Sequence, residues 1–495
     1  MKTRVFPFLS KTKYLNGLKC HKLLWYEYNR KDDLPAIDAS TQAIMDQGKA
    51  VGELAQALFP GGITVKRDYM PDKQAEKSLE AVKLRKPLFE AGFVYKQAYA
   101  LTDILNPVEK GAWDFIEVKS STSVKGEHYN DVAFQKYTYE GAGLKIRKCY
   151  LMYINNQYVR KGEIEPKKLF ATEDVTKQCD KFIPEIEANT ADMFETIQKK
   201  DVPRVKVGPH CDSPHPCPLE DICWDFLPAK DDIFCLYYGT KKAYELMERG
   251  ILRLNDINDD VSLNHKQGIQ VSCHKTGMPH IDKKGLEDFL DALKYPLYFL
   301  DFETINPAIP LYDNSRPFET IPFQYSLYIV KDEGAKPEQH SYLASGDKDP
   351  RPEILKQLKT LLGNSGAVIA YNAIFEKTTL RHASEAYPEY QDWVASLEER
   401  IIDLLIPFRN FLYYHPDQAG SASLKNVLPV MTKSNYDDME IAEGGMASIE
   451  YSRVTFGKNI DEKDRQRVRT ALEKYCDLDT KGMIEILEKL RKVCE

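Results

Sequence analysis

Long apolar runs are missing from this sequence of 495 residues. No stretch approaches the ~20 apolar residues that a membrane-spanning helix needs. The run Val5–Leu9 near the start is too short for the core of a signal peptide. We therefore expect a cytoplasmic protein without a membrane partner.

A strong excess of one charge is also missing. The 68 lysines and arginines nearly balance the 75 aspartates and glutamates, for a net charge of −7. Nucleic-acid binding is neither required nor excluded, because it needs only a local basic surface. No acid precedes Glu27, although from charge alone a solvated helix face is the simpler interpretation of this stretch. Its basic residues are Lys2, Arg4, Lys11, Lys13, Lys19 and Lys22.

Paired Cys-x₂₋₄-Cys knuckles, the usual ligands of structural zinc, are absent among the ten cysteines. A disulfide scaffold is not expected in a chain of this size that lacks a secretion signal. Six cysteines are scattered and are expected to be small core residues: Cys149, Cys179, Cys235, Cys273, Cys476 and Cys494.

The other four cysteines suggest a metal site. Three of them, Cys211, Cys217 and Cys223, lie close together in a Pro-rich loop. The fourth thiolate is expected to be Cys20, far away in the sequence. Two alternatives remain open: zinc, with His21 or His210 as a substitute ligand, and reduced thiols that bind no metal.

The length exceeds what one hydrophobic core organises, so we expect two or three domains. The hydrophobic periodicity predicts two α/β patterns separated by a polar helical stretch. The resulting division is an α/β domain at 1–228, a helical connector at 229–290 and a second α/β domain at 291–495. The predicted strands are 93–95, 99–105, 113–119, 148–154, 298–301, 324–330 and 368–371. The predicted helices include one capped by Ser10, followed by 41–59, 73–85, 129–141, 352–362, 375–384 and 463–492.

A first group of polar residues falls in the first α/β pattern. Glu117 and Lys119 share one face of a predicted strand, and Asp103 lies near the end of the preceding strand. A divalent metal held by the two carboxylates can activate a water, while Lys119 offsets charge on a phosphate. Gln135 and Tyr139 are four residues apart and therefore share a helix face. A Glu-x-Lys pair alone is common on exposed strands. A site is therefore indicated by the order of all five residues along the chain.

A second group begins where the apolar stretch Tyr295–Thr304 reaches Asp301 and Glu303. The strand is predicted to end in these two acids, which point the same way. Their repulsion is relieved by Mg²⁺ or Mn²⁺, which prefer oxygen ligands, although chance acids at a solvated strand end are the alternative. Further candidates follow downstream. They are Glu376, one turn into a helix that Asn372 is expected to cap, then Asp403, and finally Tyr475 and Asp479, which share a helix face.

The first group resembles the PD-(D/E)xK nuclease fold, in the RecB-like branch that includes CRISPR-associated exonucleases. The resemblance covers about residues 1–228 and implies that Asp103, Glu117 and Lys119 are catalytic. It also implies that the helix with Gln135 and Tyr139 contacts DNA and supports the site. An upstream acid often completes the metal shell in this family, and Glu53 is the candidate. The proline that usually precedes the aspartate is replaced by Thr102.

The cysteines also resemble those of RecB-like nucleases that hold an iron–sulfur cluster. There, one N-terminal and three clustered C-terminal cysteines ligate a [4Fe–4S] cluster, which implies the same role for Cys20, Cys211, Cys217 and Cys223. The family usually spaces the last three two and then five apart, whereas both gaps are five here. Zinc therefore remains the alternative.

The second group resembles the DnaQ-like DEDD exonucleases, which have an RNase H-like fold, over about residues 291–495. This implies that Asp301, Glu303 and Asp479 hold two metal ions and that Tyr475 orients the attacking water. Glu376 stands where the family has Asp, and its side chain is one methylene longer. Asp403 matches a position near the site that is not usually a ligand.

Both halves together resemble an uncharacterised bacterial family that fuses a RecB-like nuclease to a DnaQ-like domain. We expect a Mg²⁺- or Mn²⁺-dependent nuclease, most simply an exonuclease, that acts on DNA or single-stranded nucleic acid in repair, processing or defence. DNA is favoured over RNA. The alternatives are a nucleic-acid-binding protein with one or both sites inactive, and an RNA exonuclease that uses only the C-terminal site.

Overall fold

The computed structural model describes residues 7–495, so Lys2 and Arg4 of the basic N-terminal stretch lie outside the described residues. The chain is a mixed α/β protein with two compact units. The first unit runs to Asp225 and also includes the segment Pro307–Phe318. The second comprises Phe226–Asn306 and Glu319–Glu495, so the helices of the expected connector belong to it.

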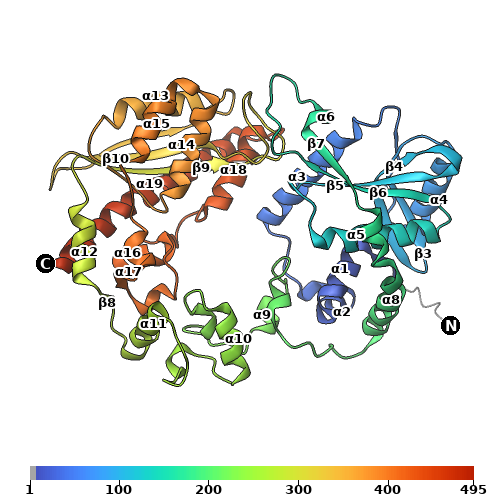
Figure 1. Ribbon diagram of the computed structural model, residues 1–495, viewed down its shortest axis with the longest axis horizontal. Coiled ribbons are helices and arrows are strands. Elements are labelled where there is room, and N and C mark those ends of the chain that lie inside the picture. Colours follow the sequence, from blue (N-terminus) through green and yellow to red (C-terminus); the bar gives the residue numbers. More distant parts are fainter. Residues whose placement is uncertain (1–6) are drawn as a thin grey trace. The chain divides into compact units, whose positions relative to one another are not determined.

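A seven-stranded sheet forms the centre of the first unit (Figure 1). Three strands form an antiparallel meander, and the next strand returns parallel to the third through α5 (Gly126–Gly141). A parallel return needs such a crossover helix. The strands are β1 (Leu9–Ser10), β2 (Ile63–Thr64), β3 (Leu88–Tyr95), β4 (Ala98–Pro107), β5 (Trp113–Lys119), β6 (Ile146–Ile154) and β7 (Phe170–Asp174).

Helix α5 packs its buried face on this sheet. The ring of Tyr139 lies 5.3 Å from that of Phe93 and 5.1 Å from that of Phe115, edge to face. These aromatic contacts fix the rotation of α5 about its axis and thus which side chains it turns toward β5. The other helices of the unit are α1 (Lys11–Lys19), α2 (His21–Asn29), α3 (Ala39–Gln56), α4 (Pro71–Val82), α6 (Pro166–Leu169), α7 (Thr176–Asp180), α8 (Ile183–Gln198) and α9 (Glu220–Cys223).

The expected capping of the first helix by Ser10 is confirmed, because its hydroxyl accepts a hydrogen bond from the Lys13 amide at 3.4 Å. The expected capping by Asn372 is wrong. Asn372 adopts a left-handed conformation with φ 69°, and the N-cap of α14 (Ile374–Ala386) is Ala373, which makes no side-chain cap. The Asn372 amide instead donates to the Asp403 carboxylate.

A five-stranded sheet of order β11-β10-β9-β12-β13 forms the core of the second unit. Its middle strand β9 (Leu297–Ile305) pairs antiparallel with β10 (Ile321–Val330) and parallel with β12 (Ala367–Ala370). The prediction that the strand ends at the two acids is wrong, because β9 continues through Ile305. The remaining strands are β11 (Glu338–Leu343), β13 (Ile401–Asp403) and the small pair β8 (His280–Ile281) and β14 (Tyr413–Tyr414).

Both faces of β9 are covered by apolar clusters. Leu297 and Phe299 pack with residues of α19 (Glu462–Cys494), whereas Tyr298 and Leu300 pack with α13 (Arg351–Leu361) on the other face. Alternation along the strand therefore assigns Asp301 and Glu303 to the α19 face. The other helices are α10 (Thr240–Glu248), α11 (His265–Thr276), α12 (Lys283–Asp291), α15 (Gln391–Glu398), α16 (Ile406–Arg409), α17 (Leu424–Met431) and α18 (Gly444–Phe456).

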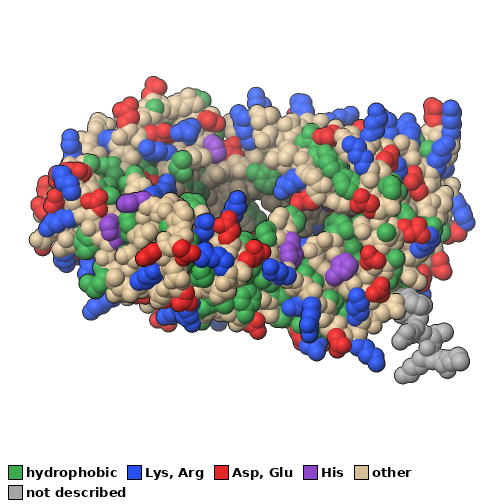
Figure 2. Space-filling model, turned by 60° about the horizontal axis from the view of Figure 1, so that its bottom comes forward, with side chains coloured by type: hydrophobic (Ala, Val, Ile, Leu, Met, Phe, Trp, Pro, Cys, Tyr) green, Lys and Arg blue, Asp and Glu red, His purple; other side chains and the backbone are tan. Residues whose placement is uncertain are grey.

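Charged side chains of both signs are interspersed over the face drawn in Figure 2. Among the described residues, no helix combines the length and apolar character that crossing a membrane requires. Short 3₁₀ turns complete the chain at Lys31–Asp33, Glu109–Gly111, Pro209–Cys211, Ile233–Cys235, Leu254–Asp256, Pro388–Tyr390 and Pro416–Gln418.

Candidate functional sites

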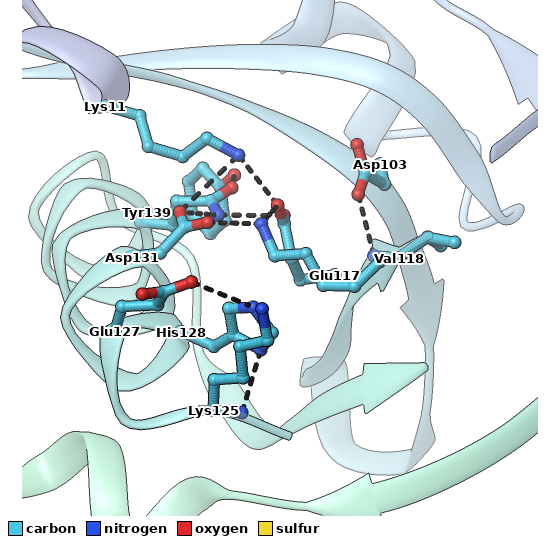
Figure 3. A network of polar contacts seen from close by, with 11 residues as sticks. Lys11, Asp103, Glu117, Val118, Lys125, Glu127, His128, Asp131 and Tyr139 are labelled. Carbon is cyan, nitrogen blue, oxygen red and sulfur yellow. Dashed lines mark hydrogen bonds and ion pairs between the residues drawn. The ribbon is translucent and has the colours of Figure 1, made fainter. Parts of the chain in front are cut away.

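The first unit brings Asp103, Glu117 and Lys119 together. Figure 3 shows Asp103 and Glu117 of this group. The pairing of Ile104 with Ile116 places Asp103 of β4 beside Glu117 of β5. Lys119 Nζ lies 2.9 Å from Glu117 Oε1, and Asp103 Oδ2 accepts a hydrogen bond from the Val118 amide at 2.7 Å. The expected trio is therefore one local group around a buried glutamate.

Helix α5 supports this group from one side. Gln135 Nε2 donates to Glu117 Oε2 at 2.8 Å, and the Tyr139 hydroxyl donates to Gln135 Oε1 at 2.7 Å. Both side chains are fully buried. In this arrangement they orient Glu117 rather than present an open surface to a ligand.

Sequence reasoning missed two members of the group, Lys11 and Asp131. Lys11 Nζ lies 2.7 Å from Glu117 Oε1 and 3.4 Å from Asp131 Oδ1, while Asp131 Oδ2 is 2.5 Å from Lys119 Nζ. Asp131 precedes Gln135 by four residues, so helical spacing was a usable signal. Lys11 is 106 residues from Glu117 in sequence, and no local pattern connects them.

The two lysines set the protonation of this group. Burial alone would raise the pKa of Glu117, but Lys11 and Lys119 hold it below its usual value. Asp103 lacks such a close partner, so burial and the Glu117 charge raise its pKa to about 7. Burial also opposes the charge on Lys11, yet Asp131 and Glu117 outweigh it and keep the pKa of that ammonium high.

The structure does not bring Glu53 to this group. Its side chain on α3 is 64% exposed and lies 3.9 Å from Lys49. A different acid, Glu90, is half-buried in β3 at a residue with φ 55°, where the pairing with β4 skips one position. Burial raises the pKa of Glu90, and the charge of Glu117 contributes to that shift. Glu90 is therefore an upstream acid whose pKa responds to the charge of Glu117, whereas Glu53 is not close to the group.

Cys20, Cys211, Cys217 and Cys223 line one small pocket of the first unit. Cys20 joins α1 to α2, and Lys22 Nζ lies 3.1 Å from Cys223 Sγ. His210 Nε2 is 3.8 Å from Cys211 Sγ, whereas His21 Nδ1 contacts Thr196 Oγ1 at 2.9 Å. The chain therefore brings the distant N-terminal thiol to the three clustered ones, as expected.

Thiolates are ligands of zinc and of iron–sulfur clusters alike, so the donor set of this pocket is compatible with both of the expected groups.

In the second unit, β9 and α19 bring a carboxylate pair and a thiol together. One ligand atom each from Asp301, Glu303 and Cys476 lie within 4.8 Å of one another, and Cys476 Sγ is 3.5 Å from Asp301 Oδ2. Asp479 lies one turn further along α19 and accepts hydrogen bonds from the Tyr436 and Tyr475 hydroxyls. Tyr436 and Cys476 were not predicted as part of this group.

Glu376 and Asp403 have different surroundings. Glu376, in the first turn of α14, is 1% exposed, and its Oε2 is buried without a hydrogen-bond partner. Asp403 Oδ1 accepts from the Asn372 amide at 2.9 Å and from the Leu405 amide at 3.0 Å. Asp403 therefore holds the backbone turn beside the site, while Glu376 offers an unused oxygen.

The electrostatics of this group are unfavourable without a cation. Burial and then the neighbouring carboxylates raise the pKa values of Asp301, Glu303 and Glu376 well above their ordinary values. Burial raises the pKa of Asp479 to about 6, although its tyrosine hydrogen bonds and Lys425 oppose the shift. Clustered oxygen donors with one unsatisfied atom fit a hard divalent cation such as Mg²⁺ or Mn²⁺. Cys476 adds a soft donor.

Comparisons with known proteins cover part of the chain. Residues 298–423 match a family described as "Domain of unknown function (DUF2779)". The "Uncharacterized protein MG366 homolog" of Mycoplasma pneumoniae is 26% identical over 230 residues, 41% of this chain and 34% of that protein. The "Uncharacterized protein UU173" of Ureaplasma parvum is 26% identical over 230 residues, 42% of this chain and 33% of that protein. The chain thus spans about a third of the length of these curated relatives.

Proposed function

We propose that this protein is a metal-dependent nuclease with one phosphodiesterase site in each unit. The observation that carries the proposal is the buried carboxylate group of the second unit, Asp301, Glu303, Glu376 and Asp479, in which Glu376 keeps an unsatisfied oxygen. Such an arrangement opposes folding unless a cation is bound. It supports a DnaQ-like domain, because each motif falls on the expected strand or helix.

The first unit supports a RecB-like site. Its Asp103, Glu117 and Lys119 meet at neighbouring strands, with Gln135 and Tyr139 behind them. A separate pocket of about 790 Å³ in this unit is lined by several basic side chains that suit phosphates: Lys19, Lys199, Lys200 and Arg204. These features favour nucleic acid as the substrate.

In this mechanism the chain's own residues bind and orient the reactants. Asp301, Glu303, Glu376 and Asp479 would hold Mg²⁺ or Mn²⁺ in one site, and Asp103 and Glu117 in the other. Bound ions supply a water of lowered pKa and offset the charge of the leaving oxygen. Tyr475 orients the attacking water through its hydroxyl, and Lys119 donates to the phosphate oxygens as negative charge develops on them.

The deciding experiment is a nuclease assay with Mg²⁺ or Mn²⁺ on end-labelled linear and circular DNA, both single- and double-stranded, with RNA alongside. We expect Lys119→Ala and Asp301→Ala each to lower the rate at its own site by about 100-fold or more. Glu53→Gln, which alters an exposed carboxylate outside both groups, is the matched control. Full activity in the Lys119→Ala, Asp301→Ala double variant contradicts the proposal.

One observation favours a second candidate, a nucleic-acid-binding protein with an inactive first site. Lys11 and Lys119 already pair with Glu117 and Asp131, so a metal ion must compete with two ammonium groups there. Salt-dependent binding without turnover on any substrate would select this function. Turnover of RNA alone, lost in Asp301→Ala and kept in Lys119→Ala, would select an RNA exonuclease that uses only the second site.

We also propose that the four clustered cysteines bind a [4Fe–4S] cluster. The convergence of one N-terminal thiol and three clustered thiols on one pocket supports this assignment. Protein purified without oxygen is expected to contain about four iron and four sulfide per chain, and Cys217→Ser is expected to lose them. Zinc without iron or acid-labile sulfide in that preparation, together with failed iron loading, excludes the cluster.

A further inference from the structure

Cys476 occupies an unusual place for a buried thiol. It is fully buried on α19, three residues before Asp479, and its Sγ lies 3.5 Å from Asp301 Oδ2. Its sulfur and one oxygen each of Asp301 and Glu303 lie within 4.8 Å of one another. Three donor atoms this close can bind one ion at ordinary bond lengths, which are ~2.3 Å to sulfur and ~2.0–2.2 Å to oxygen.

A second observation in the same place points to a ligand. Glu376 Oε2 is buried without a hydrogen-bond partner, and the charge of Asp301 acts on that carboxyl. The thiol donates a hydrogen bond to Asp301, and two carboxylates and an unsatisfied oxygen are not the apolar surroundings of a cysteine that only fills the core. The neighbours of Cys476 are instead those of a metal ligand.

We propose that Cys476 is a direct ligand of the ion that Asp301 and Glu303 hold, which makes this a mixed oxygen and sulfur site. A thiolate favours softer divalent ions, so the site selects Zn²⁺, Co²⁺ or Cd²⁺ over Mg²⁺ more strongly than carboxylates alone do. As the sulfur–metal bond forms, the thiol proton passes to solvent. The inference rests on the metal site of the proposed function and adds its ion preference.

The test uses the full chain and Cd²⁺ or Co²⁺ as the probe ion. A thiolate bound to either ion produces a charge-transfer absorption band in the ultraviolet. Because the four clustered cysteines also bind such ions, the informative quantity is the difference between wild type and Cys476→Ser. We expect that variant to lose one thiolate's share of the band and about 10- to 100-fold in Cd²⁺ affinity, with a smaller change for Mg²⁺.

Three further variants make the result specific. Cys494→Ser, at the C-terminal end of the same helix, is the matched control and keeps the band. Asp301→Asn keeps the thiol but is expected to lose the same share of the band, because the carboxylate and the thiol bind one ion. Cys476→Ala replaces the serine variant if the buried hydroxyl prevents folding, as judged by thermal melting.

The inference is overturned if both Cys476 variants show a charge-transfer band as strong as that of the wild type. A band that Asp301→Asn leaves intact also overturns it, because the thiol would then bind without the carboxylate. The readout is independent of catalysis. If no substrate is cleaved while the band behaves as expected, the proposed function fails and the ligand assignment stands. If cleavage depends on Asp301 but the Cys476 variants keep the full band, the proposed function stands and the ligand assignment fails.

Discussion

Glu376 is a buried carboxyl of the second unit with one oxygen that has no hydrogen-bond partner. Its Oε2 has no partner, and burial followed by the charge of Asp301 raises its pKa. A carboxyl with a raised pKa in the folded state contributes stability below its ordinary pKa, and that stability is lost as pH rises toward the folded value. The metal-free protein should therefore be strained here at neutral pH.

Glu376→Gln is expected to stabilise the metal-free protein at pH 8 by about 1–3 kcal/mol, because it removes a buried charge that has no partner. At pH 4 the gain should nearly vanish, since the native carboxyl is then protonated. Urea denaturation in EDTA at both pH values measures the difference. Glu385→Gln, an exposed change on the same helix, is the control. Equal effects of Glu376→Gln at the two pH values would show that its charge is not the cause.

Asp103 sets a pH window for the first unit. Burial, followed by the charge of Glu117, raises its pKa to about 7. Without metal, its contribution to stability is full below about pH 4 and is lost as pH rises to about 7. We expect the melting temperature of the metal-free protein to fall across this window, and Mn²⁺ to reverse the fall. Thermal melting from pH 4 to 8 checks this, and a profile unchanged in Asp103→Asn would refute the assignment.

At this scale the sequence indicated the side chains that follow periodic patterns and missed those that do not. Asp301 and Glu303 alternate on a strand, and Tyr475 and Asp479 are one helical turn apart, so a pattern revealed them. The sequence predicts only a core position for Cys476, because a lone cysteine carries no spacing signal. Lys11 reaches Glu117 only through the tertiary fold.

Among the elements, α1 joins two features of the first unit. It begins at Lys11, in the carboxylate group, and ends where Cys20 caps it beside the other cysteines. Nine residues of helix span ~13 Å. Helix α1 therefore positions the Lys11 ammonium beside Glu117 at its N-terminal end, and its C-terminal end lies at the cysteine pocket.

Lys11→Met keeps most of the apolar stem but removes the ammonium. We expect the activity of the first site to fall by about 100-fold, because the variant loses one of the two cations that hold the pKa of Glu117 low. Cleavage at the second site should not change. Lys13→Met removes a lysine of the same helix that lies over the Tyr28 ring and is the control. If both variants lose activity equally, loss of helix α1 itself is the explanation.

The local hydrophobic pattern predicted most helices and strands. It did not predict the features of strands that depend on their neighbours in the sheet. β11 was missed because its sequence, Glu338–Leu343, is polar and alternates poorly, as is usual for an edge strand that solvent reaches. The sequence predicts too early an end for β9, because two acids on one face suggest that the strand stops there. In fact Glu303 and Asp301 pair with Gln324 and Ser326 of β10, and this pairing cannot be read from β9 alone.

For the whole molecule, the chain enters the first unit twice. Residues Pro307–Phe318 belong to it although unit-two residues precede and follow them. Arg160 Nη1 donates to the Pro310 and Leu311 carbonyls at 3.0 and 2.6 Å, and the Ala308 amide donates to Gln47 Oε1 at 3.0 Å. The first unit is therefore completed by a segment about 150 residues downstream of Arg160.

Arg160→Met is expected to destabilise the first unit by about 1.5–3 kcal/mol, the usual cost of losing hydrogen bonds from a charged group. The second unit should unfold as before, so only one part of the denaturation curve should move. Urea titrations followed by hydrogen exchange separate the two units. Lys161→Met, an exposed neighbouring change, should leave both parts unmoved; a shift of the second unit in Arg160→Met would contradict the division.

Two α/β units were predictable from the two periodic patterns, and the structure agrees at that coarse level. The return of residues 307–318 to the first unit was not, because it depends on contacts between segments far apart in the chain. Hydrophobic patterns report which residues are buried but not which distant segment buries them.

The position of α1 also affects how the protein should be handled at the bench. If air destroys an iron–sulfur cluster at Cys20, one end of this helix loses its anchor and Lys11 leaves its place against Glu117. A sample prepared in oxygen would then test negative for cleavage at the first site while its carboxylates remained intact. An inactive aerobic preparation would reflect its purification history, and assays become meaningful only after iron and sulfide have been counted.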